Sequence, residues 1–186
     1  MKKLSLIFAI LASAIVAQAS PLWMRYPAIS PDGEKVAFCY KGSIYVASVN
    51  GGEAVRVTPT AHYDYAPVWS PDSKTIAFAS NRYGNFDVFT VEATGGTPKR
   101  VTTNSASEEP SAFSPDGKKI YFSATISDPV ESAFFPKGSM QELYAIPTTG
   151  GRYERVLATP AQALSFSRDG KRFLYQDRKG GEDDLR

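Results

Sequence analysis

A four-residue motif, Ser-Pro-Asp-Gly, and the apolar segment after it recur along this chain at a nearly regular spacing. The copies begin at Ser30, Ser70, Ser114 and Ser167, with Ser in place of Gly in the second copy and Arg in place of Pro in the fourth. Their starting points are separated by 40, 44 and 53 residues. A repeat of this length indicates an array of similar supersecondary units that bury their apolar faces against one another.

Each unit carries local signals for four short strands. Proline presets φ at the second position of the motif, aspartate suits the third, and glycine accepts a positive φ, so the motif predicts a tight turn between two strands. After the turn, apolar residues such as Ile76 and Phe78 alternate with small or polar ones. Later in the unit a Gly-Gly pair, first Gly51 and Gly52, predicts a hairpin turn before a segment such as Arg56-Val57-Thr58.

Four antiparallel strands in about 40–45 residues are the unit of a β-propeller blade. The sequence therefore predicts an all-β protein, a β-propeller of four-stranded antiparallel blades, with about three and a half blades present. The expected blades span residues 25–58, 66–102, 110–157 and 163–186, and the last of them is incomplete. Because propellers have about 4–8 blades, we expect the segment to belong to a longer product.

The first residues of the chain follow a different pattern. Lys2 and Lys3 precede an apolar run from Leu4 to Val16, and the small residues Ala17 and Ala19 fit a cleavage site. This order predicts a secretory signal peptide over residues 1–19, and the apolar run is shorter than the roughly 20 residues of a membrane-spanning helix. We therefore expect the propeller segment, residues 20–186, to be exported to the periplasm or cell envelope, with no membrane span after cleavage.

The charge balance limits the class of partner. The chain has 21 Lys and Arg against 19 Asp and Glu, and loss of Lys2 and Lys3 with the signal peptide makes the two counts equal. No basic run is present that would bind nucleic acid or an anionic membrane surface. The expected partner is a peptide or a protein, either a downstream catalytic domain or an envelope protein, and no nucleic acid is expected.

Few residues of the chain can support catalysis or metal binding. Cys39 is the single cysteine and lies in an apolar segment, which favours a buried, unreactive thiol. His62 is the single histidine, and no pair of residues has metal-ligand spacing. The chain has no Gly-x-Ser-x-Gly nucleophile elbow, and the aspartates of the repeated motif are expected to shape their own turns. We expect no catalytic residue, no metal and no cofactor.

Two segments depart from the repeat and are candidates for contacts with a peptide or partner. One is the aromatic-rich stretch from His62 to Tyr65, which is expected to be a loop between the first and second blades. The other is an insertion in the third unit, within Ile126–Gln141, that contains three apolar side chains a solvated loop does not need. In both segments the alternative is that the side chains pack onto their own blades. The candidate contact residues are His62, Tyr63, Asp64, Phe134, Phe135 and Met140.

The pattern from Pro67 to Gly84, with Asp87-Val88-Phe89, Gly95-Gly96 and Arg100-Val101-Thr102 after it, resembles the TolB-type propeller repeat. Three families share such blades, so the resemblance specifies a fold more closely than a function. The phrase Trp23-Met24-Arg25-Tyr26 before the first turn is most similar to the N-terminal propeller of exported bacterial tricorn-type serine peptidases.

This resemblance implies a non-catalytic propeller segment that steers or gates peptide substrates, or docks partner domains, for a peptidase whose catalytic residues lie elsewhere. Two alternatives stay open. One is a TolB-like periplasmic protein-binding propeller, and the other is the propeller of a prolyl-oligopeptidase-like exopeptidase.

Overall fold

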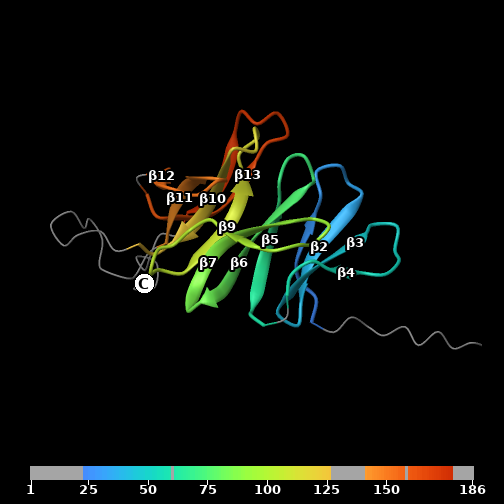
Figure 1. The fold of residues 1–186 in the computed structure, drawn as a ribbon. Helices are drawn as coiled ribbons and strands as arrows, with labels where there is room; N and C mark the ends of the chain where they lie inside the picture. The colour runs from blue at the N-terminus through green and yellow to red at the C-terminus, as the bar shows by residue number, and fades with distance from the viewer. Residues whose placement is uncertain (1–22, 60, 127–140, 158, 178–186) are drawn as a thin grey trace, which may run out of the picture.

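The computed structural model of the chain describes residues 23–59, 61–126, 141–157 and 159–177, and in these ranges every regular element is a β-strand. The expected signal peptide, residues 1–19, lies outside them. The strands form three four-stranded antiparallel sheets and one two-stranded sheet, which lie side by side (Figure 1). This arrangement confirms the expected fold, a partial β-propeller of about three and a half blades.

Each sheet is built from consecutive strands, and we number the sheets as blades 1 to 4 in chain order. Blade 1 contains β1 (Arg25–Ile29), β2 (Lys35–Tyr40), β3 (Ser43–Ser48) and β4 (Val55–Arg56). Blade 2 contains β5 (Asp64–Trp69), β6 (Thr75–Tyr83), β7 (Asn85–Glu92) and β8 (Lys99–Arg100). Blade 3 contains β9 (Glu108–Phe113), β10 (Lys119–Ala124), β11 (Glu142–Pro147) and β12 (Glu154–Arg155). Blade 4 contains β13 (Ala161–Phe166) and β14 (Phe173–Asp177).

The Ser-Pro-Asp motif makes the same turn in all four blades. In blade 2 the Ser70 hydroxyl donates to Asp72 Oδ1 at 2.5 Å, Asp72 Oδ1 accepts the Lys74 N–H at 3.1 Å, and Ser70 Oγ accepts the Thr75 N–H at 2.9 Å. These bonds satisfy the backbone of the turn locally, which explains why serine and aspartate recur together. The serine hydroxyl and the backbone N–H lower the pKa of the turn aspartate in each copy: Asp32, Asp72, Asp116 and Asp169.

The hydrophobic core lies between blades. The residue before each turn serine packs on the preceding blade: Trp69 joins a cluster with Ala37 and Cys39 of blade 1, and Phe113 joins one with Ala77 of blade 2. Trp69 also donates its indole N–H to the carbonyl of Ala28 at 2.9 Å, so the seam between blades 1 and 2 has a directional bond as well as apolar contact.

At the equivalent position in blade 1, Ile29 has no preceding blade to pack on. Its side chain is 69% exposed, whereas that of Trp69 is 6% exposed. An apolar residue at the same position of the repeat is therefore a core residue inside the array and a surface residue at its edge.

A β-bulge interrupts the first strand of every blade. The register between the first and second strands shifts in all four sheets. Tyr26, Ala66 and Ala163 stand at equivalent positions in these bulges, with φ of 54°, 50° and 51°, and blade 3 has Pro110 there. A bulge bends its strand and turns the side chains next to it, so it sets the direction in which the early residues of each first strand project.

In blades 1 and 2 a threonine side chain takes over part of the pairing of the short outermost strand. The N–H of Ile44 donates to Thr58 Oγ1 at 3.0 Å in blade 1, and the N–H of Val88 donates to Thr102 Oγ1 at 2.8 Å in blade 2. This contact explains the threonine in the repeated Arg-Val-Thr segment. Blade 4 differs because residues 178–186, where its third strand was expected to begin, lie outside the described residues.

Candidate functional site

The alternation of strand direction places the loops on two opposite faces. The Ser-Pro-Asp turns and the Gly-Gly turns lie on one face, which we call the turn face. The turns between second and third strands and the connections between blades lie on the other, the connection face. Hydrogen bonds join neighbouring segments of the connection face: Asp64 N–H to the Gly42 carbonyl, Ala161 N–H to the Gln141 carbonyl, and the Asn85 side chain to the Asn104 carbonyl.

The first segment singled out in the sequence, and the described residues that flank the second, lie on the connection face. His62 and Tyr63 are exposed in the connection between blades 1 and 2. Ile126 and Gln141, the described residues that flank the insertion, follow β10 and precede β11, at the same end of blade 3. Phe134, Phe135 and Met140 lie outside the described residues.

Tyr63 is held in place although its side chain is 41% exposed. Its N–H donates to Asn81 Oδ1 at 2.9 Å. Its ring lies against Gly42, where a Cβ would come within 3.0 Å of Tyr63 Cδ2. Since Gly42 also has a φ of 76°, this glycine is required both by its backbone conformation and by the ring beside it. Tyr63 therefore presents a fixed aromatic face to solvent.

The expected loop from His62 to Tyr65 is wrong for its second half, because β5 begins at Asp64. Asp64 is fully buried and pairs with Arg82 at 2.9 Å between Oδ2 and a guanidinium nitrogen. A buried carboxylate with an arginine partner is a structural element of the blade and does not face a ligand from solvent. The hydrophobic pattern missed the early start of β5 because the strand opens with a charged residue followed by a bulge.

Four aromatic side chains form what we call the aromatic cluster: Tyr26, Tyr63, Tyr65 and Phe86. The ring centroids of Tyr26 and Tyr65 are 5.3 Å apart, those of Tyr65 and Phe86 are 5.0 Å apart, and those of Tyr63 and Tyr65 are 6.1 Å apart. These separations are typical of favourable tilted and edge-to-face pairs. Tyr26 lies in β1 and Tyr65 in β5, so the cluster crosses the seam between two first strands.

The carboxylate of Glu109, in β9 of blade 3, extends this cluster to a third blade. Burial raises the pKa of Tyr65, and the charge of Glu109 and a hydrogen bond to it raise that pKa further. Burial and the charge of Glu109 also raise the pKa of Tyr26. Sequence reasoning named only Tyr63 of this group, because the others come together through contacts between first strands.

A separate set of charged residues is buried inside the blades. Asp87 is fully buried and lies 2.8 Å from the Arg100 guanidinium, and Glu142 lies 3.0 Å from that of Arg155. In both pairs the arginine follows the acid by 13 residues, a spacing that could have been read from the repeat. Equivalent acids at equivalent places in successive blades indicate a structural role.

Glu108 is the buried acid without such a partner. Its side chain is 1% exposed, and neither of its carboxylate oxygens has a hydrogen-bond partner among the described residues. Burial raises the pKa of Glu108 to about 7; the nearby Thr102 hydroxyl and the charge of Arg100 oppose this rise, and the negative charge of Asp87 adds to it. Asp64 holds the equivalent position in blade 2, where Arg82 neutralises it.

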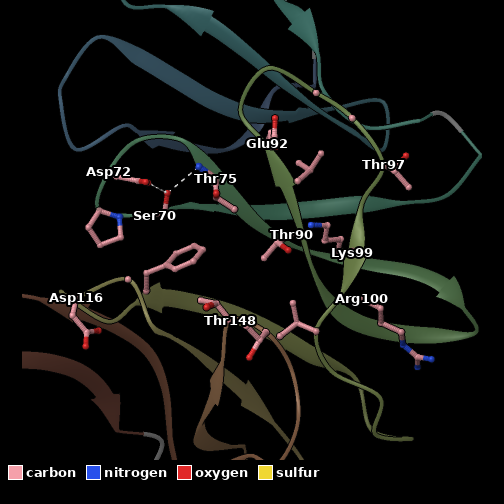
Figure 2. Close-up of a pocket in the computed structure, with 18 of the residues that line it drawn as sticks. Ser70, Asp72, Thr75, Thr90, Glu92, Thr97, Lys99, Arg100, Asp116 and Thr148 are labelled. Carbon is pink, nitrogen blue, oxygen red and sulfur yellow. Dashed lines mark hydrogen bonds between the residues drawn. The ribbon is translucent and has the colours of Figure 1, made fainter.

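A groove of about 910 Å³ lies between blades 2 and 3 on the turn face. Figure 2 shows Ser70, Thr75, Thr90 and Lys99 on the blade 2 side, with Asp116 and Thr148 opposite them. Hydroxyl groups and charges of both signs line the groove, together with Pro71, Phe113 and Pro115. It lies on the face opposite to the aromatic cluster.

The remaining chemistry of the described residues is limited. Cys39 is buried, its thiol donates to the Asp64 carbonyl at 3.1 Å, and burial raises the pKa of the thiol. The thiol is therefore buried, as expected, and a raised pKa disfavours the reactive thiolate. In the part of the chain that the structure describes, no three His, Cys, Asp or Glu side chains come close enough together to hold a metal ion, and no helix could cross a membrane.

Solved structures with the same fold include two TolB proteins and a tricorn protease. The putative TolB from Agrobacterium tumefaciens is 22% identical with a TM-score of 0.68, over 83% of this chain and 54% of that one. TolB from Acinetobacter baumannii is 23% identical with a TM-score of 0.68, over 86% of this chain and 39% of that one. The tricorn protease is 15% identical with a TM-score of 0.50, over 67% of this chain and 13% of that one. The chain thus spans about half or less of the length of these proteins.

These likenesses define the class of protein, a β-propeller with TolB-type blades. Within that class, residues 21–186 match the tricorn protease N-terminal β-propeller domain, and the chain belongs to this family. The match covers nearly the whole sequence and all four blades, and it confirms the resemblance seen in the repeat.

Proposed function

We propose that this chain is the non-catalytic propeller segment of an exported tricorn-type serine peptidase, and that it binds peptides or a partner domain through its connection face. The observation that carries the proposal is the aromatic cluster. Fixed, partly exposed tyrosines at the end of the first strands offer a rigid surface that costs little conformational entropy when a partner binds. Family membership supports the peptidase context.

Several features bear on the details of the proposal. The sequence pattern of residues 1–19 supports export to the periplasm or cell envelope. His62 is a contact residue in this proposal, as are Phe134, Phe135 and Met140 of the insertion, and none of them has a catalytic role. The second candidate is a periplasmic propeller that binds a protein and has no peptidase attached, and the TolB-like fold supports it. A prolyl-oligopeptidase-like exopeptidase is the third.

The test measures peptide binding to the full chain. A peptide mixture is equilibrated with the protein across a dialysis membrane, and retained peptides are identified by mass spectrometry. The wild-type chain is expected to retain a subset of peptides. Loss of an aromatic anchor in Tyr63→Ala should weaken retention by about tenfold or more.

Tyr175 provides a matched control because its side chain is also 41% exposed but lies in β14, outside the aromatic cluster. Tyr175→Ala should retain peptides as the wild type does. If the wild type retains no peptide above background, the proposal of peptide binding is wrong. Retention of a folded protein partner from an envelope extract, with no peptide bound, would favour the TolB-like alternative.

A further inference from the structure

The early residues of the first strands hold equivalent places in the repeat and lie at one end of the array. Five residues before the turn serine, these places are occupied by Arg25, Tyr65, Glu109 and Gln162. Neighbouring first strands contact one another, so these side chains gather where the blades meet. The bulge that follows in each strand directs them.

Glu108 and Glu109 are neighbours in β9, but one side chain is buried inside the blade and the other reaches solvent. Successive residues of a strand project to opposite sides, and Glu108 is buried while Glu109 is partly exposed. Strand β9 packs against β5, which in turn packs against β1, and Glu109 lies within hydrogen-bond reach of the Tyr65 hydroxyl. Among the described residues Glu109 has no salt-bridge partner, whereas Asp64, Asp87 and Glu142 each face an arginine.

A carboxylate that lies beside aromatic rings and has no salt-bridge partner among the described residues is a suitable environment for a cation. The faces of tyrosine rings attract an ammonium or guanidinium group, and a carboxylate adds a charge-assisted hydrogen bond. Arg25, which holds the equivalent place in blade 1, lies over the ring of Trp23, with its guanidinium carbon 5.5 Å from the ring centroid. An anionic ligand would instead meet the like charge of Glu109.

We propose that Glu109 and the aromatic cluster form a binding site for the side chain of a lysine or arginine in an extended peptide. This inference rests on the proposed function and names its substrate class: peptides with a basic residue are held at the end of the first strands. Tyr26 and Tyr63 supply exposed aromatic faces, Tyr65 orients the Glu109 carboxylate, and that carboxylate neutralises the incoming charge.

The experiment compares two fluorescently labelled peptides that differ at one position, lysine or norleucine. Norleucine keeps the aliphatic chain and removes the ammonium group. Binding to the full chain is followed by fluorescence anisotropy. The wild type is expected to bind the lysine peptide about tenfold more tightly than the norleucine peptide.

Two variants carry matched changes of charge. Glu109→Gln keeps a hydrogen-bond acceptor for Tyr65 and should abolish the preference for lysine while leaving the affinity for the norleucine peptide unchanged. Glu92→Gln removes the same charge from the groove on the turn face and should leave the preference intact. Circular dichroism spectra of both variants should match that of the wild type.

The outcomes separate this inference from the proposed function. Equal binding of both peptides by the wild type, or a lysine preference that survives in Glu109→Gln, would overturn the cation site and leave peptide binding standing. No binding of either peptide would overturn both.

Discussion

At the scale of single residues, the position before each turn serine shows how the surroundings of a side chain determine its contribution to the free energy of unfolding. Trp69 and Phe113 occupy this position in blades 2 and 3, and both pack between blades. Truncation of either to alanine should lower the free energy of unfolding by about 3–5 kcal/mol, because a large buried aromatic group is lost. Urea denaturation monitored by circular dichroism measures the effect.

Ile29 provides the internal control for this prediction. It holds the same place in blade 1 but is largely exposed. Ile29→Ala should change the free energy of unfolding by no more than about 0.5 kcal/mol. Equal losses in Ile29→Ala and Trp69→Ala would contradict the assignment of the core to the seams between blades.

The buried carboxyl of Glu108 predicts a pH dependence of stability. Its pKa of about 7 in the folded chain lies above the ordinary value of 4.5, so the folded state binds the proton more tightly than the unfolded state. Its stabilising contribution is therefore complete below about pH 4.5 and is lost as the pH rises to about 7. The loss should amount to about 2–3 kcal/mol.

The difference between wild type and Glu108→Gln isolates this effect, because the other titrating groups are common to both. Urea unfolding at a series of pH values should show the wild type losing stability relative to the variant between about pH 4.5 and pH 7. Parallel pH profiles would mean that the carboxyl is solvated or paired in solution.

At the scale of strands and turns, the Gly-Gly hairpins differ in what surrounds them. Gly51 and Gly150 both have a positive φ, of 90° and 84°. A Cβ at Gly51 would meet nothing within 4 Å, whereas one at Gly150 would lie 3.3 Å from the Val101 carbonyl oxygen of blade 2. The third blade therefore packs so closely against its neighbour that an added Cβ at Gly150 would crowd the backbone of blade 2.

Alanine substitutions at these two glycines should separate backbone strain from contact between blades. Gly51→Ala should cost about 1 kcal/mol for the left-handed conformation alone. Gly150→Ala should cost about 1 kcal/mol more, because the added methyl group crowds backbone of the next blade. Thermal unfolding followed by calorimetry ranks the two variants, and a smaller loss in Gly150→Ala would refute the close packing.

Much of this element structure could be predicted from the sequence because it depends on local chemistry. The Ser-Pro-Asp turns satisfy their own backbone, and the alternation around Ile76 and Phe78 marks a strand whose large side chains pack toward blade 1 while Ala77 packs toward blade 3. The start of β5 at Asp64 could not be predicted from the pattern of apolar residues, because the buried residue there is a carboxylate paired with Arg82.

The candidate site was less predictable than the fold. Tyr63 was noticed as an unusual aromatic residue in a connection. Its relation to Tyr26 and Glu109 depends on contacts between blades that are about 40 residues apart in sequence, and no local pattern records such contacts.

At the scale of the whole molecule, two blade faces are left uncovered among the residues that the structure describes. Ile29 lies on the outer face of blade 1, and Leu174, which is 80% exposed, lies on the outer face of blade 4. Their counterparts Trp69 and Ala77 are buried between blades. Repeat arrays gain stability from neighbour interfaces, and an end face without a polar cap favours association.

We therefore expect the protein to self-associate as its concentration rises. Sedimentation velocity should show a shift to larger species, which Ile29→Ser combined with Leu174→Ser should suppress. The matched control is Val49→Ser, an exposed apolar residue after β3. A monomer at all concentrations would show that the two faces are not adhesive.

The two tryptophans make the seam between blades 1 and 2 visible to spectroscopy. Trp23 is 69% exposed, whereas the Trp69 indole is buried and bonded to the Ala28 carbonyl across the seam. Replacement of Trp23 by phenylalanine would leave a single emitter in a rigid, apolar setting. Its fluorescence should then be blue-shifted and shielded from an aqueous quencher such as iodide, and any opening between these two blades would be recorded as a red shift with renewed quenching.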